Sequence, residues 1–161
     1  MKIIITGGKS AKSLKLLKAF EAAQVILADY GDVPSFTSPL YTFFSLGERN
    51  DEIIAHNLLN TCLDEEADTL LPLYDFEVEA IAKSILLFRE YNINVLLPDA
   101  AVLPLYFKAP IPAVEGWAVI DEGKLIYSSL PWIPVFKEKV SGVFNYADIK
   151  DEIFTSLYLI S

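Results

Sequence analysis

Residues 3–29 read IIITGGKSAKSLKLLKAFEAAQVILAD and carry the clearest indication of the fold class. The apolar, β-branched run over residues 2–6 ends at two glycines, as expected for a strand buried on both faces. A helical pattern follows over residues 10–22, and a second apolar run over residues 24–28 ends at Asp29. Strand, glycine turn, helix and strand in this order predict a βαβ unit with parallel strands and a right-handed crossover.

The same alternation of apolar runs and helical patterns continues to residue 99. We expect a loop over residues 30–40, a strand over 41–46, a helix capped by Asn50 or Asp51 and ending near Glu65, a strand over 69–73, a helix capped by Asp75 with an apolar stripe that reaches Phe88, and a strand over 93–97. Strands that alternate with helices define an open α/β sheet. The predicted fold is therefore a three-layer, Rossmann-like, mostly parallel sheet.

The pattern is less regular after residue 99. Prolines interrupt residues 100–114, so at most a short helix fits there. Apolar runs over 117–120 and 124–127 flank Gly123 and predict a β-hairpin. Residues 148–160 place apolar side chains four apart and predict a C-terminal helix. We expect one domain over residues 1–161, with a regular core in 1–99 and a β-hairpin and a helix in 100–161.

Composition limits the classes of function. The chain has 161 residues, of which 53% are hydrophobic, and its formal net charge is −9. Its apolar runs are shorter than the ~18 residues of a membrane span, and the negative charge argues against nucleic acid and anionic membranes as partners. A lone cysteine, Cys62, and the short apolar start after Met1 predict a cytoplasmic protein. The apolar surplus predicts a homo-oligomer or a surface for a separate domain.

The glycine turn suggests a phosphate-binding loop, but neither standard spacing is present. A Walker A loop would need glycine at Ile3, and a GxGxxG motif from Gly8 would need glycine at Ser10 and Ser13. Two interpretations remain for Gly7, Gly8, Lys9 and Ser10. The helix start could bind ATP or another nucleotide through its N–H groups, or the glycines form a tight turn that Ser10 caps.

Acidic residues at the ends of strands are further candidate ligand-binding residues. Asp29 lies about 20 residues after the turn, where NAD-binding folds place an acid on the ribose. Asp75 and Glu77 stand at a predicted helix start, where they could contact a cation or an amine, or only complement the helix dipole. The lone histidine, His56, and Cys62 have simple structural interpretations. The sequence identifies no catalytic residue, no metal site and no definite cofactor.

Two stretches, IIITGGKSAKSLKLLKAFEAAQVILAD and DTLLPLYDFEVEAIAKS (residues 68–84), together resemble the pre-ATP-grasp domain of ATP-grasp ligases. These ligases include the carbamoyl-phosphate synthase large chain and carboxylate-amine ligases. The shared features are a strand that ends in Thr-Gly, a strand that ends in Ala-Asp, and a later strand that ends at a proline, Pro72, with Asp75 and Glu77 shortly after it. The resemblance covers residues 1–99.

In these ligases a catalytic ATP-grasp module follows the domain, and the remaining sixty or so residues here are too few to form one. The resemblance therefore implies a module that is not catalytic alone and acts by association, as a homodimer or with a separate ATP-grasp ligase partner, in which case the complex would be an ATP-dependent ligase. The alternative is a nucleotide-binding or small-molecule-binding protein or enzyme that uses the turn at Gly7 to Ser10.

Overall fold

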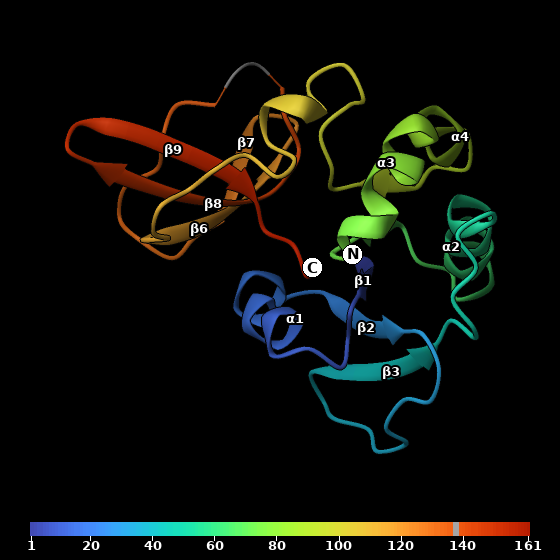
Figure 1. The fold of residues 1–161 in the computed structure, drawn as a ribbon. Coiled ribbons are helices and arrows are strands. Elements are labelled where there is room, and N and C mark those ends of the chain that lie inside the picture. Colours follow the sequence, from blue (N-terminus) through green and yellow to red (C-terminus); the bar gives the residue numbers. More distant parts are fainter. Residues whose placement is uncertain (137–138) are drawn as a thin grey trace. The chain divides into compact units, whose positions relative to one another are not determined.

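The computed structural model describes residues 1–136 and 139–161, and its chain divides into two compact units (Figure 1). The first unit contains residues 1–95 and 159–161, and the second contains residues 96–158. The boundary lies close to residue 99, where we expected the regular core to end. The single-domain organisation itself stays a prediction.

The first unit is built on a five-stranded parallel sheet. Its strands are β1 (Lys2–Thr6), β2 (Gln24–Asp29), β3 (Tyr41–Ser45), β4 (Thr69–Leu71) and β5 (Asn94–Val95), in the spatial order β3-β2-β1-β4-β5. The central strand β1 places Ile4 between Ile26 of β2 and Leu70 of β4. All three side chains are buried, as the uninterrupted apolar runs require. The predicted open α/β sheet is confirmed.

Helical segments connect most of these strands, with shorter helices than the sequence predicts. They are α1 (Ala11–Lys15), the 3₁₀ helix η1 (Leu16–Phe20), α2 (Ile54–Asp64), α3 (Asp75–Lys83) and α4 (Ile85–Glu90). Ser10 caps α1 through its hydroxyl, which accepts the N–H of Lys12. The predicted cap at Asp75 is wrong by one residue, because Tyr74 takes the extended backbone of the N-cap. The predicted cap of α2 at Asn50 or Asp51 is wrong, because the helix begins at Ile54 with Ile53 at the N-cap. Asn50 instead accepts the N–H of Glu52 in the preceding turn.

The strand order creates a switch point between β1 and β4. From β1 the chain moves to β2 on one side, and from β3 it returns across the sheet to β4 on the other side. Right-handed crossovers in opposite directions put α1 and α2 on opposite faces of the sheet. Helices α2, α3 and α4 lie together in Figure 1, apart from α1. Open α/β proteins bind ligands beyond the carboxyl ends of the strands at such a switch point, so this crevice is the first place to look for a site.

The second unit contains a four-stranded antiparallel sheet and a short 3₁₀ helix, η2 (Leu103–Leu105). Its strands are β6 (Gly116–Asp121), β7 (Lys124–Ser128), β8 (Gly142–Ile149) and β9 (Glu152–Leu157), in the spatial order β7-β6-β8-β9. The predicted hairpin is formed by β6 and β7, and Gly123 has a φ of 81° at its turn.

The predicted C-terminal helix over residues 148–160 is wrong, because these residues end β8 and form β9. Lys150 and Asp151 connect the two strands and both have positive φ, of 52° and 65°. Two such residues make the tight turn whose twist matches an antiparallel pair. Side chains four apart lie on one face of a helix, but they also lie on one face of a strand, where the period is two. In the structure Ile153 is half exposed on its strand.

Among the described residues, no helix has the length and apolar character needed to cross a lipid bilayer.

Candidate functional site

The glycine turn follows β1 and packs tightly against the rest of the first unit. Gly7 has a φ of 71°, which favours glycine, and a side chain here would clash with Ile160. A β-carbon on Gly8 would lie 2.7 Å from the backbone carbon of Leu27 in β2. Both glycines are therefore needed for close packing, whether or not a ligand binds.

Three N–H groups of this turn already have acceptors within the chain. Gly8 N–H donates to the Ala28 carbonyl at 2.9 Å, Ser10 N–H donates to the Gly7 carbonyl at 2.9 Å, and Lys9 N–H donates to the Asp29 carboxylate at 3.0 Å. A phosphate cradle needs such groups to point at the ligand. Here the Asp29 carboxylate occupies the place of an anion at the turn.

Asp29 is 2% exposed and collects three hydrogen bonds. Besides the N–H of Lys9 it accepts the N–H of Tyr30 and the hydroxyl of Tyr74, both at 2.8 Å. The Asp29 carboxylate thus joins β2, the glycine turn and the segment after β4. Asp29 ends β2 and lies beside the glycine turn, and its oxygens face protein donors.

Glu77 is the second buried acid of the site, with 0% of its surface exposed. Its Oε1 accepts the Thr6 hydroxyl at 2.6 Å and the N–H of Tyr74 at 3.2 Å, and its Oε2 accepts the Tyr30 hydroxyl at 2.6 Å. Thr6 in turn accepts the N–H of Leu73 at 2.8 Å. Burial raises the pKa of Glu77 to about 7, and the hydrogen bonds from Thr6 and Tyr30 oppose that rise.

Two tyrosines connect the two acids. Burial raises the pKa of Tyr30, and the neighbouring charge of Glu77 adds to the rise; burial and the hydrogen bond to Asp29 likewise raise the pKa of Tyr74. Both phenols therefore stay protonated and donate. Asp29 and Glu77 are held by hydroxyl and N–H donors, which is the condition for burying a carboxylate.

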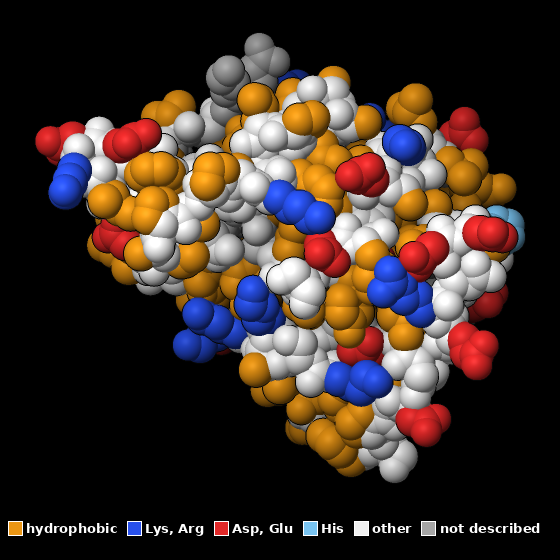
Figure 2. Space-filling view, viewed as in Figure 1, with side chains coloured by type: hydrophobic (Ala, Val, Ile, Leu, Met, Phe, Trp, Pro, Cys, Tyr) orange, Lys and Arg blue, Asp and Glu red, His pale blue; other side chains and the backbone are white. Residues whose placement is uncertain are grey.

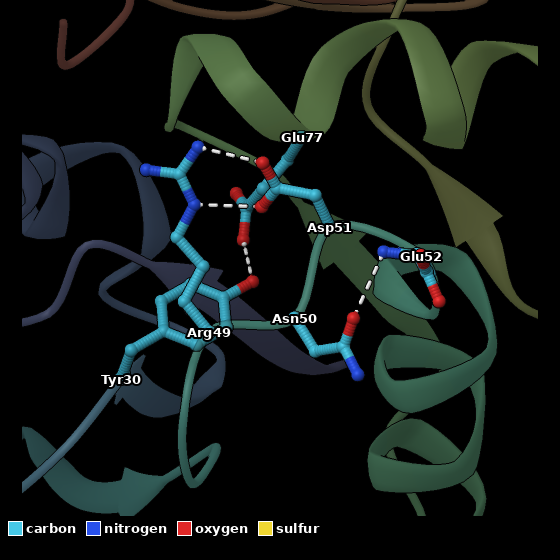
Figure 3. A network of polar contacts seen from close by, with 6 residues as sticks. All are labelled: Tyr30, Arg49, Asn50, Asp51, Glu52 and Glu77. Atoms are coloured by element: carbon cyan, nitrogen blue, oxygen red, sulfur yellow. Dashed lines mark hydrogen bonds and ion pairs between the residues drawn. The ribbon is translucent and has the colours of Figure 1, made fainter.

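An aromatic group lies beside this network. The rings of Tyr74 and Phe76 are stacked with centroids 4.9 Å apart, and the Tyr30 ring lies 5.5 Å from Phe76. The Arg49 guanidinium lies 3.6 Å from the centroid of Phe76, a cation–π distance. Figure 3 shows Tyr30 pointing at Glu77 while Arg49 pairs with Asp51, at a distance of 2.7 Å. The chain therefore supplies its own cation to the exposed side of these rings.

Residues 159–161 fill the switch-point crevice. Ile160 forms a parallel bridge with Tyr74: its N–H donates to the Leu73 carbonyl at 2.7 Å, and its carbonyl accepts the N–H of Asp75 at 3.0 Å. Its side chain lies against Gly7. The place where this fold usually holds a ligand is thus occupied by residues of the chain itself.

The structure brings together most of the residues that the sequence identified. Gly7, Gly8, Asp29 and Glu77 lie around the crevice. Lys9 reaches the Tyr30 carbonyl with its Nζ at 2.8 Å, and Ser10 only caps α1. Asp75 is half-buried in the first turn of α3. Their role in binding stays a prediction.

The hydroxyl donors of this network are Thr6, Tyr30 and Tyr74, none of which was identified from the sequence. Each lies at or just after the end of a strand, where α/β proteins place functional side chains. A buried acid needs donors, so polar residues at the ends of the neighbouring strands were the signal that could have found them.

The arrangement can hold a proton but offers it no path. An acid with a pKa near 7 suits general acid or base chemistry. Glu77, however, is fully buried and both of its oxygens accept hydrogen bonds. Within residues 1–136 and 139–161, every buried side-chain nitrogen or oxygen has a hydrogen-bond partner. Chemically, this network is a cross-link between β1, β2 and α3.

The other candidates lie apart from this network. His56 is exposed on α2. Cys62 is buried on the same helix, and burial raises the pKa of its thiol to about 12, which keeps it protonated. In the described part of the chain, no three His, Cys, Asp or Glu side chains are grouped closely enough to hold a metal ion.

No protein family matches this sequence, and a search of curated proteins gave no match either. Among solved structures, the fold is similar to glycinamide-RNase-transformylase T from Mycobacterium tuberculosis, with a TM-score of 0.46 and 10% sequence identity. The aligned region covers 93% of this chain and 54% of that chain, so this chain spans about half the length of the structure it matches.

Proposed function

We propose that this chain is a cytoplasmic, pre-ATP-grasp-like module that is not catalytic alone and acts by association, with a second copy of itself or with a separate ATP-grasp-type ligase. The two stretches in residues 3–29 and 68–84 support the pre-ATP-grasp interpretation. The buried, protonated Cys62 is compatible with a reducing compartment.

One observation carries the proposal: the crevice at the carboxyl ends of the strands is closed by the chain's own groups. The N–H groups of Gly8, Lys9 and Ser10 have acceptors within the first unit. The two carboxylates and Ile160 are engaged there as well. A nucleotide at this crevice would have to break these contacts and approach the Asp29 carboxylate. The exposed surface, in contrast, retains large apolar side chains such as Phe36, Leu40 and Leu86.

A thermal-shift experiment separates this proposal from nucleotide binding. At a hundred times its Kd, a ligand of the native state would add about 2.7 kcal/mol and raise the Tm by about 5–10 °C. We expect ATP, ADP and NAD, each with and without Mg²⁺, to leave the Tm unchanged. A rise that disappears in Lys9→Ala but persists in the exposed control Lys83→Ala would overturn the proposal.

Association is measured on the same protein. The mass by light scattering should exceed the 18.0 kDa of one chain, or the chain should co-purify with an ATP-grasp ligase identified by mass spectrometry. A monomer that brings down no such ligase would contradict the proposal.

A further inference from the structure

Strand β3 is an edge of the parallel sheet with half of its backbone turned outward. It pairs with β2 only, and the Leu46 N–H donates to the Asp29 carbonyl at 2.8 Å. Because backbone groups alternate in direction along a strand, those of Tyr41, Phe43 and Ser45 face away from β2. The Tyr41 carbonyl shows this directly, since it accepts the N–H of Ser38 in the preceding loop. The Tyr41 carbonyl is thus already engaged, and the backbone groups of Phe43 and Ser45 can pair with another strand.

Tyr41–Ser45 lacks three of the features that usually prevent such pairing, although the preceding loop reaches the edge at Tyr41. Proteins protect edge strands with charged residues, prolines or bulges. Tyr41–Ser45 contains no charged residue and no proline, and its register with β2 is continuous. It lies within residues 33–47, which form the longest uncharged stretch in a chain of net charge −9. This is therefore a surface on which two copies can meet without repulsion between like charges.

An aromatic cluster stands on one side of the edge. Phe36, Tyr41 and Phe43 contact one another with ring centroids 5.4 to 6.4 Å apart. Phe36 is 56% exposed and the neighbouring Leu40 is 62% exposed. Figure 2 shows hydrophobic side chains gathered over this loop and β3 at the lower edge of the view. The next strand of a continued sheet would cover this side.

We propose that a second copy of this chain binds here, with the two β3 strands antiparallel across a twofold axis at Phe43. This inference rests on the proposed function and names its partner. Since the Phe43 N–H and carbonyl both face outward, Phe43 and Phe43 of the partner subunit exchange two hydrogen bonds. The same register brings the two Phe43 rings together as a cross-strand aromatic pair. The contact is self-complementary, as a twofold interface requires.

The exposed area of the cluster sets the expected affinity of the dimer. A buried aromatic side chain contributes about 150–250 Å²; Phe36 is 56% exposed while Tyr41 and Phe43 are partly buried, so the three rings offer on the order of 200 Å² per copy. Two copies would bury well under the ~1,200 Å² at which stable interfaces begin. The dimer is therefore weak and forms in a concentration-dependent way.

The test is sedimentation velocity over a concentration series of the full chain. Wild type should pass from monomer to dimer as concentration rises. Phe43→Lys and Phe43→Glu should each stay monomeric, because like charges would face each other at the axis, and their mixture should dimerise again. Leu86→Lys, on the exposed side of α4, is the matched control and should dimerise like wild type.

Circular dichroism melts check that each variant folds, and Phe36→Glu in the exposed loop replaces the Phe43 variants if they do not. A wild type that stays monomeric overturns the inference. A dimer that the β3 variants leave intact also overturns it, and so does a dimer that Leu86→Lys abolishes equally. In both of these cases the chain associates through another surface, so the proposed function is retained. Loss in each β3 variant with recovery in the mixture supports pairing through β3.

Discussion

The crevice at the carboxyl ends of the strands and the β3 edge belong to the same sheet, but their polar groups differ in where they find hydrogen-bond partners. At the crevice, two buried carboxylates and the N–H groups of the glycine turn are satisfied inside the chain. At β3, the backbone groups of Tyr41, Phe43 and Ser45 face outward beside the exposed ring of Phe36. Polar groups at the usual ligand position of this fold can therefore stabilise the chain, while an edge strand with outward backbone groups can bind a partner. If so, changes at the crevice should alter stability, and changes at the edge should alter association.

The largest effect is expected from closing the space beside the glycine turn. In Gly8→Ala the new β-carbon would lie 2.7 Å from the Leu27 backbone, which cannot move without distorting β2. We expect a loss of about 3 kcal/mol in the free energy of unfolding, measured by urea denaturation. Gly47→Ala is the control: Gly47 has a φ of 79° but open space around it, so only backbone strain of about 1 kcal/mol is expected. Equal losses would contradict tight packing at Gly8.

The next effect is a pH dependence of stability that originates in Glu77. Burial raises its folded pKa to about 7, above the ordinary value of 4.5, so the folded state binds the proton more tightly than the unfolded chain. This contribution to stability is fully present below about pH 4.5 and is lost as the pH rises through about 7. The free energy of unfolding should therefore fall by about 3 kcal/mol between these limits.

Two variants isolate this effect from the other carboxyl groups. Glu77→Gln has no proton to lose, and its unfolding free energy should vary less with pH than that of wild type over the same range. Tyr30→Phe removes the hydroxyl that donates to the ionised carboxylate, which should move the midpoint of the decline to higher pH. Identical pH profiles for wild type and Glu77→Gln would show that the buried acid does not set this dependence.

The smallest effect on stability is expected at the edge. Phe36 is 56% exposed, so Phe36→Ala should lower the unfolding free energy of the monomer by less than about 1 kcal/mol. The lost aromatic contacts should nevertheless weaken the dimer about threefold to tenfold, measured by sedimentation equilibrium. Tyr91→Ala, at a similarly exposed aromatic outside β3, should leave the dimer unchanged. If Phe36→Ala left self-association unaltered, the aromatic cluster would not be part of the dimer interface.

Local patterns predicted the parallel sheet well and the second unit only in part. The glycine turn, the β-branched strands and the cap at Ser10 each depend on neighbouring residues, and the structure contains them. The prediction of a helix over residues 148–160 was wrong because apolar residues four apart fit both a helix and a strand. There the tight turn at Lys150 and Asp151 and pairing between β8 and β9 decide the structure. Ile149 pairs with Glu152 beside the turn and Phe144 pairs with Leu157 at the far end, so the turn rather than the apolar spacing sets the register.

The same distinction explains the candidate site. The apolar pattern alone places the acids and glycines at the ends of strands, because strand ends follow from that pattern. Their hydrogen-bond partners depend on how the strands are arranged in the sheet. Thr6 meets Glu77 across 71 positions and Tyr74 meets Asp29 across 45. The hydrogen bonds that close the crevice exist because the parallel sheet aligns the carboxyl ends of separate strands, and the β3 edge is open because strand order, not sequence order, decides which strand lies last.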